Sequence, residues 1–206
     1  IKTAEVSEYL PHLKHKILIF DELFEYSIDS PILKQNLILA LKLLHEEGVP
    51  VPLLKEATAS LDLTVKGRFQ QIEMNDWILI DDTYNANPSS FYMVLENLNK
   101  TYPEFRKIVV CGPMAELGDL SPELHRQVGE TMVKNGIEKM FGLGGAEIKS
   151  YLEGWNKAGG KTGAVKHFSD IDDLTQTFRE ELRPADVVLV KGSRSAQMER
   201  FVEAML

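Results

Sequence analysis

Polar side chains that could bind a nucleotide or an amino acid gather in three short segments, each directly after an apolar run. The segment DDTYNANPSS (residues 81–90) follows WILI, GPMAELG (residues 112–118) follows IVVC, and KGSR (residues 191–194) follows VVLV. Such apolar runs are typical of strands in a parallel sheet, whose carboxyl ends meet at one edge and bind ligands there. The sequence therefore predicts one concave site built from three loops.

The first of these segments suits a nucleotide or an amine. Asp82 could accept hydrogen bonds from a ribose hydroxyl or a substrate ammonium, and Tyr84 could stack on a base or close a pocket. A purely structural interpretation also exists, because Asp and Asn form turns and Asn87-Pro88 is an ordinary start of a helix.

The other two segments carry charge. In KGSR, Lys191, Arg194 and the free N–H groups of a helix that begins at Ser193 suit a carboxylate or a phosphate. The alternative is that Ser193 only caps the helix while the cations are solvated. Glu116, in a loop flanked by glycines, could likewise be a solvated acid.

Alternating strands and helices would position these loops. A pair of helices is expected first, at residues 31–47 and 52–61, after a buried strand at residues 16–20. Strands are expected at residues 69–74, 77–82, 107–111, 139–144, 165–168 and 186–191. Helices are expected from Pro88, Ser121, Gly145, Ser169 and Ser193, with Asn87, Ser121 and Ser169 as N-caps. This order predicts an α/β fold with a doubly wound, largely parallel, Rossmann-like sheet.

Composition narrows the functional classes. The chain has 206 residues, and 31 Asp+Glu against 23 Lys+Arg give a formal net charge of −8, which argues against binding to nucleic acid. The single cysteine, Cys111, excludes a disulfide framework and fits a small core residue. No apolar run approaches the roughly 18 residues that span a bilayer. His125, alone on its expected helix, is more typical of a packed or surface residue than of a catalyst.

Two glycine-rich segments resemble phosphate-binding motifs only in part. Gly159-Gly160-Lys161-Thr162 lacks the first glycine of a P-loop at the required spacing, and a helix rather than a strand is expected before it. In the segment that begins at Gly142, Glu147 stands at the position where a dinucleotide-binding motif has its last glycine. The sequence therefore contains no convincing triphosphate cradle.

Taken together, five segments resemble the C-terminal domain of the Mur ligases in order and spacing: GRFQ (residues 67–70), DDTYNANPSS, GPMAELG, Leu124-His125 and VLVKGSR. The DDxYNANP string resembles the branch that adds D-alanyl-D-alanine to UDP-N-acetylmuramoyl-tripeptide. The resemblance covers residues 67–206, and residues 31–61 resemble the helical end of the family's central ATPase domain. It implies a central-domain remnant at residues 1–66, a C-terminal domain at residues 67–206 and a hinge at Gly67.

The resemblance implies an ATP-dependent carboxylate–amine ligase of peptidoglycan precursor synthesis. In this family ATP and Mg²⁺ convert a UDP-muramoyl carboxylate into an acyl phosphate, which the incoming amine attacks. The expected partners are UDP-N-acetylmuramoyl-tripeptide and D-alanyl-D-alanine, with no nucleic acid and no membrane span. A cytoplasmic monomer is expected.

The resemblance also implies roles for individual residues. ATP-binding residues would be Asn36, Arg68, Asp82, Tyr84, Asn85 and Asn87. The dipeptide would be bound by Glu116, Lys191, Ser193 and Arg194. The chain departs from the family pattern at Pro113, where an acid is usual, and at Ser30 and Ile32, where a glycine and a histidine are usual.

The family's P-loop, magnesium ligands, modified lysine and UDP-binding domain would all precede Ile1. The chain is therefore expected to be the C-terminal portion of a longer ligase, with no catalytic residue of its own and no activity alone. Two alternatives stay open: another ligase of the superfamily, of the folylpolyglutamate or cyanophycin type, and a non-catalytic module that binds a small ligand.

Overall fold

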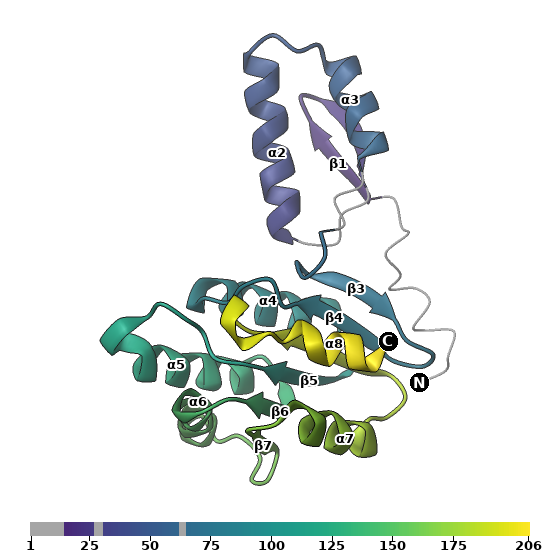
Figure 1. The fold of residues 1–206 in the computed structure, drawn as a ribbon. Coiled ribbons are helices and arrows are strands. Elements are labelled where there is room, and N and C mark those ends of the chain that lie inside the picture. The colour runs from purple at the N-terminus through teal and green to yellow at the C-terminus, as the bar shows by residue number, and fades with distance from the viewer. Residues whose placement is uncertain (1–14, 27–30, 62–64) are drawn as a thin grey trace.

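The computed structural model describes residues 15–26, 31–61 and 65–206, which form a small N-terminal part and a larger sheet domain (Figure 1). In the small part, strands β1 (His15–Ile19) and β2 (Glu22–Tyr26) form an antiparallel hairpin. Helices α2 (Pro31–Glu46) and α3 (Val51–Ser60) follow, as the apolar spacing predicts. Ser30 lies outside the described residues, and so does the side chain of Ile32.

The hairpin changes the expected packing of the small part. The sequence predicts a buried strand followed by a helical pair, but β1 is half-exposed, with Leu18 65% accessible, and β2 was not expected. The helices share a core with the hairpin, which includes Phe24, Leu37, Leu41 and Leu54. Each helix therefore covers the hairpin rather than packing only against the other helix.

The sheet domain confirms the predicted α/β architecture. Its strands are β3 (Gln70–Glu73), β4 (Ile78–Asp82), β5 (Arg106–Cys111), β6 (Ile137–Leu143), β7 (Val165–Phe168) and β8 (Asp186–Lys191). They lie in the order β3-β4-β8-β5-β6-β7, and every pair is parallel except β3 with β4. Strands β4, β5 and β8 are buried on both faces, which explains their continuous apolar runs.

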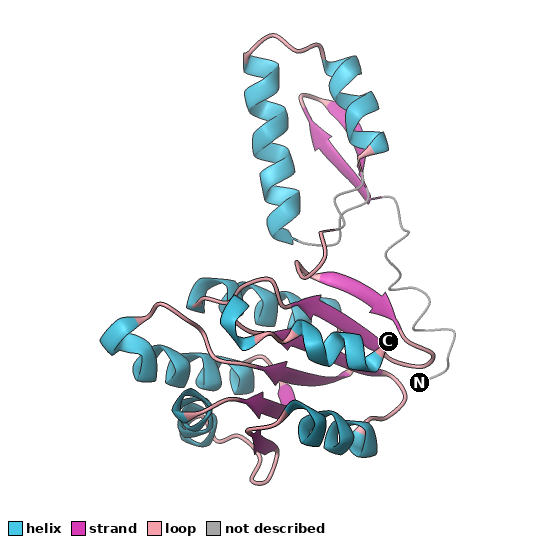
Figure 2. Cartoon of the chain, viewed as in Figure 1, coloured by secondary structure: helices cyan, strands magenta, loops and turns pink. Residues whose placement is uncertain are grey.

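Helices cover both faces of this sheet (Figure 2). Their bounds are α4 (Pro88–Thr101), α5 (Ser121–Lys134), α6 (Ala146–Lys157), α7 (Ile171–Glu181) and α8 (Glu199–Met205). Side chains of α4, α5 and α6 form the core on one face, and side chains of α7 and α8 form the core on the other. Within the described residues, no helix combines the length and the apolar character that crossing a membrane requires.

Helix ends are where the structure departs from the sequence. Asn87 caps α4 as predicted, but Ser121 is the first residue of α5 rather than its cap, after a short 3-10 helix at Gly118–Leu120. Helix α7 is capped by Asp170 instead of Ser169. The last predicted helix is two pieces, a 3-10 turn at Arg194–Ala196 and then α8, because Gln197 adopts a left-handed φ of 49°.

Mutation can test whether Asp170 or Ser169 caps α7. The Asp170 carboxylate accepts hydrogen bonds from the backbone N–H groups of Asp172 (2.8 Å) and Asp173 (3.1 Å). We expect Asp170→Ala to lower the free energy of unfolding by about 1 kcal/mol in urea denaturation, because two N–H groups lose their acceptor. The matched variant Ser169→Ala should change it by less than about 0.5 kcal/mol. The opposite ranking would restore Ser169 as the cap.

Candidate functional site

The carboxyl ends of the three central strands lie side by side. Lys191 at the end of β8 is in register with Asp82 of β4 on one side and with Cys111 of β5 on the other. The three predicted loops therefore start at the same edge of the sheet. Burial raises the pKa of the Cys111 thiol, so this cysteine stays protonated and fits the predicted role of a core residue.

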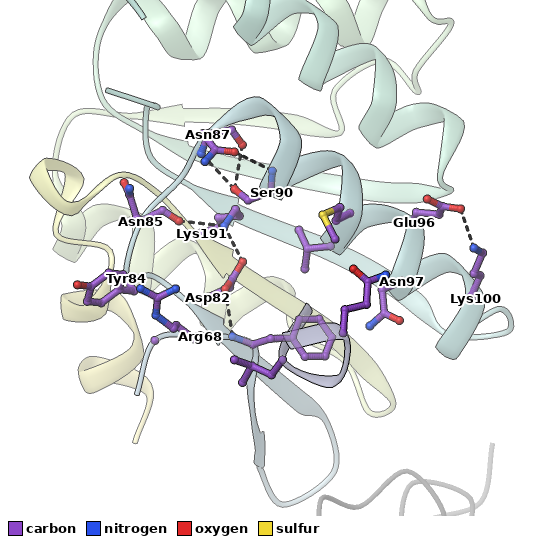
Figure 3. A pocket seen from close by; sticks show the side chains of 16 residues that line it. Arg68, Asp82, Tyr84, Asn85, Asn87, Ser90, Glu96, Asn97, Lys100 and Lys191 are labelled. Atoms are coloured by element: carbon purple, nitrogen blue, oxygen red, sulfur yellow. Dashed lines mark hydrogen bonds and ion pairs between the residues drawn. The ribbon is translucent and has the colours of Figure 1, made fainter. Parts of the chain in front are cut away.

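A cavity of about 360 Å³ opens beside this edge (Figure 3). Its walls come from residues 67–69 before β3, from the loop after β4, from one face of α4 and from the start of α2. The lining residues are Leu33, Gln35, Gly67, Arg68, Phe69, Asp82, Tyr84, Asn85, Asn87, Ser90, Met93, Val94, Glu96, Asn97, Lys100 and Lys191.

A buried ion pair lies at the base of the cavity. The Lys191 ammonium is 2.6 Å from Oδ2 of Asp82 and donates to the Asn85 carbonyl at 3.0 Å, as the dashed lines in Figure 3 show. The side chain of Lys191 is 1% exposed and that of Asp82 is 17% exposed. The Phe91 ring lies 5.4 Å from the ammonium. Because a buried cation needs partners, this pair fixes the shape of the loop after β4.

Asp82 is held from both sides. Its Oδ1 accepts the backbone N–H of Phe69 at 3.1 Å, while Oδ2 is held by Lys191. Each carboxylate oxygen keeps a free lone pair, so Asp82 can still accept hydrogen bonds from a ligand in the cavity.

The rim of the cavity combines a cation and an aromatic ring. The Arg68 guanidinium lies 4.1 Å from the centre of the exposed Tyr84 ring. The Tyr84 N–H donates to the Gly67 carbonyl at 2.9 Å, which ties the segment before β3 to the loop after β4. Gly67 has a φ of +76°, and a Cβ there would lie 3.0 Å from the Tyr84 nitrogen. A side chain at position 67 would therefore strain this contact.

The two asparagines of the loop have structural partners in addition to facing the cavity. Asn87 and Ser90 form a capping box at the start of α4, with the Ser90 N–H 2.8 Å from Oδ1 of Asn87. Oδ1 of Asn85 accepts the next backbone N–H, that of Ala86, at 2.9 Å. The turn before them is braced by Asp81, which accepts two hydrogen bonds from Thr83. The structural and functional interpretations of this loop are thus compatible.

The binding residues predicted from the sequence do not include the face of α4 that lines the cavity. Met93, Glu96, Asn97 and Lys100 recur at helical spacing along it, and Glu96 pairs with Lys100 at 2.6 Å. This i, i+3, i+4 recurrence is a detectable signal, but it shows only that the residues share a face, not that the face borders a site.

The structure does not bring all the predicted binding residues to this cavity. Arg68, Asp82, Tyr84, Asn85, Asn87 and Lys191 line it, whereas Asn36, Glu116, Ser193 and Arg194 do not. On α2 it is Leu33 and Gln35, not the exposed Asn36, that line the cavity. The sequence predicts Lys191 to act with Ser193 and Arg194, but its ammonium points to Asp82 of the neighbouring strand β4.

Three other predicted residues lie in the loops that follow β5 and β8. Ser193 is buried, and its hydroxyl is 3.0 Å from that of Ser195. Arg194 is exposed and pairs with Glu199 at 3.1 Å. Glu116 is exposed and has a left-handed φ of 62°. In the described part of the chain, no three His, Cys, Asp or Glu side chains come together as a metal site would require.

Comparison with known proteins identifies the family. Residues 67–194 match the family model of the Mur ligase, glutamate ligase domain. The chain belongs to the Mur ligase family. The match begins at the glycine that meets the loop after β4 and ends at the arginine of KGSR, so it includes all three strand-end loops.

Several curated relatives of this Mur ligase chain are D-alanyl-D-alanine ligases. It is 34% identical over 163 residues to the UDP-N-acetylmuramoyl-tripeptide–D-alanyl-D-alanine ligase of Buchnera aphidicola subsp. Acyrthosiphon pisum, covering 77% of this chain and 34% of that protein. It is 33% identical over 173 residues to the Escherichia coli K12 ligase of the same name, covering 82% and 36%. The chain thus spans about a third of the length of these relatives.

Solved structures agree with these sequence matches. The MurF ligase of Thermotoga maritima, in complex with ADP, superposes with a TM-score of 0.73 and 27% identity, covering 92% of this Mur ligase chain and 42% of that one. A MurF from Acinetobacter baumannii, 23% identical, superposes with a TM-score of 0.75 and supports the fold.

The buried ion pair of this Mur ligase chain can be tested by a double-mutant cycle. We expect Lys191→Met to lower the free energy of unfolding by about 3 kcal/mol, because it leaves the Asp82 carboxylate without its cation. Asp82→Asn should also destabilise, but the double variant should be more stable than the sum of the two changes implies. Urea denaturation with a fluorescence readout measures all four proteins. Strict additivity would show that the two side chains do not interact.

Proposed function

We propose that this chain is the C-terminal part of an ATP-dependent ligase that adds D-alanyl-D-alanine to UDP-N-acetylmuramoyl-tripeptide in peptidoglycan precursor synthesis. The observation that carries the proposal is the cavity formed around the DDTYNANP loop, in a chain whose matched relatives bear the name of that ligase. In such a ligase a carboxylate oxygen attacks the γ-phosphorus of ATP and releases ADP. The dipeptide amine then attacks the acyl carbon and releases phosphate.

The cavity is proposed to bind the nucleotide. Asp82, fixed by Lys191 and the Phe69 N–H, would accept hydrogen bonds from the ribose hydroxyls. Arg68 would bring positive charge to the phosphates, and Tyr84 beside it would border the base or ribose. Asn85 and Asn87 line the same wall. The ADP in the Thermotoga MurF structure supports a nucleotide site in this chain as well. The contact of Lys191 with Asp82 favours a role in which Lys191 positions the Asp82 carboxylate.

The dipeptide is proposed to bind at the loops that follow β5 and β8. Arg194 could bind its carboxylate in a charge-assisted hydrogen bond, with the Ser193 hydroxyl beside it. Glu116, exposed on the loop after β5, could attract its ammonium. These groups supply one cation and one anion on neighbouring loops, which is the charge pattern that a zwitterionic dipeptide requires.

The small N-terminal part is proposed to be the end of the central ATPase domain, with the C-terminal domain beginning at Gly67. Exposed leucines on its hairpin and helices support a neighbour there, because burying them against another domain would remove apolar surface from water. They include Leu18, Leu23, Leu39, Leu43 and Leu53. The proposal assigns Mg²⁺ binding and the phosphoryl-transfer residues to other parts of the ligase, and it places the enzyme in the cytoplasm, where ATP is supplied.

The nucleotide role of Arg68 can be tested in the ligase that carries this chain. Arg68→Ala should raise the KM for ATP by about tenfold or more, the effect of losing a charge-assisted hydrogen bond, with little change in the KM for the dipeptide. The exposed Arg200 of α8 supplies a matched control, since Arg200→Ala removes the same charge away from the cavity. Steady-state kinetics measure both. Similar effects of the two variants would reject the assignment of Arg68.

The dipeptide role of Ser193 predicts the opposite selectivity. Ser193→Ala should raise the KM for D-alanyl-D-alanine by about tenfold or more and leave the KM for ATP nearly unchanged. Ser195→Ala is the control, because it removes the hydroxyl that Ser193 contacts while keeping the Ser193 hydroxyl itself. An equal rise in both KM values would contradict the role. Absence of any dipeptide-dependent turnover in the wild-type ligase would overturn the proposed function.

A further inference from the structure

His125 of α5 is a fully buried side chain to which the proposed function gives no task. Its Nε2 accepts the backbone N–H of Met114, in the loop after β5, at 3.0 Å. Its Nδ1 lies 2.7 Å from the Ser121 carbonyl, one turn earlier on the same helix, and 3.3 Å from the Ser121 hydroxyl, which can accept as well as donate. The ring also meets the Tyr151 ring edge to face, with centroids 4.8 Å apart. These contacts leave the imidazole one orientation.

The two ring contacts determine where the proton is. A backbone N–H can only donate, so Nε2 must be unprotonated, and a carbonyl can only accept, so Nδ1 must carry the hydrogen. The ring is therefore neutral. Burial lowers the pKa of His125, and the Ser121 carbonyl and the Glu147 carboxylate only partly oppose this effect. The hydrogen-bond acceptor for Met114 thus persists near neutral pH.

The peptide unit that His125 holds also contacts the KGSR loop. The N–H of this unit belongs to Met114 and its carbonyl belongs to Pro113, and that carbonyl accepts the Ser193 N–H at 2.9 Å. One planar peptide group therefore joins the imidazole of α5 to the backbone of Ser193. A second strand-end contact, from the Gly112 N–H to the Lys191 carbonyl at 3.0 Å, keeps the two loops aligned.

We propose that His125 is a positioning residue, which holds the Pro113–Met114 peptide in place and, through it, the Ser193 backbone at the dipeptide subsite. The positioning role rests on the proposed function, whereas the hydrogen-bond link itself does not. Without an acceptor at His125 the buried Met114 N–H would lose its partner, and the peptide would rotate toward another one. Rotation of a planar peptide turns its carbonyl as well, so the Ser193 N–H would lose its partner in turn.

Two variants separate this role from simple packing. His125→Gln places Oε1 near the position of Nε2 and keeps an acceptor, whereas His125→Leu fills the space without one. Val128→Ala is the control for general destabilisation, because Val128 is buried on the same helix and takes no part in the hydrogen-bond link. Amide hydrogen exchange of the 206-residue chain, followed by NMR, reports on the loop directly.

In His125→Leu, exchange at the Met114 and Ser193 amides should quicken about tenfold relative to the Ile80 amide of β4. His125→Gln should stay close to the wild type, and Val128→Ala should change the three amides in parallel. The hydrogen-bond link is overturned if His125→Leu affects the three amides equally, or if His125→Gln behaves like His125→Leu.

Kinetics of the ligase that carries this chain test the positioning role. His125→Leu should raise the KM for D-alanyl-D-alanine about tenfold with the KM for ATP unchanged, and His125→Gln should restore it. If the amides respond but the dipeptide KM does not, the positioning role is overturned while the link stands. If the wild-type ligase does not use the dipeptide, the proposed function fails, and the exchange result still decides the link.

Discussion

The burial of one ammonium group constrains the whole edge of the sheet. Lys191 ends the central strand β8, where apolar strands enclose its backbone, yet its cation cannot be left without partners. The neighbouring strand ends in Asp82, in register with Lys191, and the loop beyond turns the Asn85 carbonyl back toward the same nitrogen. The conformation of the DDTYNANP loop, and so the cavity, follows from satisfying this charge.

The end of β8 contacts the loops on both of its sides. The side chain of Lys191 extends toward the loop after β4, while the backbone of Lys191 and Ser193 bonds to the loop after β5. The cavity and the Glu116 loop are therefore built on a common rigid strand end. If the two loops bind the two proposed reactants, such a shared support would hold them in a fixed relation, and misplacement of either reactant slows a reaction.

Much of this arrangement could be predicted from the sequence. Runs such as IVVC and VVLV are long enough in apolar residues to specify strands covered on both faces, and their alternation with helices specifies the parallel sheet. The placement of three polar loops at one edge follows from that topology alone. The cap of α7 could not be predicted in this way, because Ser169 and Asp170 are adjacent and both are good caps, so local preference could not choose between them.

Other features depend on contacts between distant residues. A lysine side chain at the end of β8 can reach the loops on either side, so the sequence could not show that Lys191 turns to Asp82 rather than lining a ligand site with Arg194. The left-handed Gln197, which divides the last helix, has no local signal such as glycine. The β2 strand pairs with residues only a short turn away, but the alternation of ELFEY is too brief to separate it from a loop.

The strand order also has a consequence for how the chain is made. Strand β8 (Asp186–Lys191) is the last strand of the sheet in the sequence, yet it lies between β4 (Ile78–Asp82) and β5 (Arg106–Cys111), which are synthesised much earlier. During translation the ribosome therefore exposes two halves of a sheet with a gap between them, each presenting an unpaired edge. Strand β8 can fill this gap only after it leaves the ribosome. We therefore expect the unpaired edges of β4 and β5 to make the nascent chain more prone to aggregation than the folded chain.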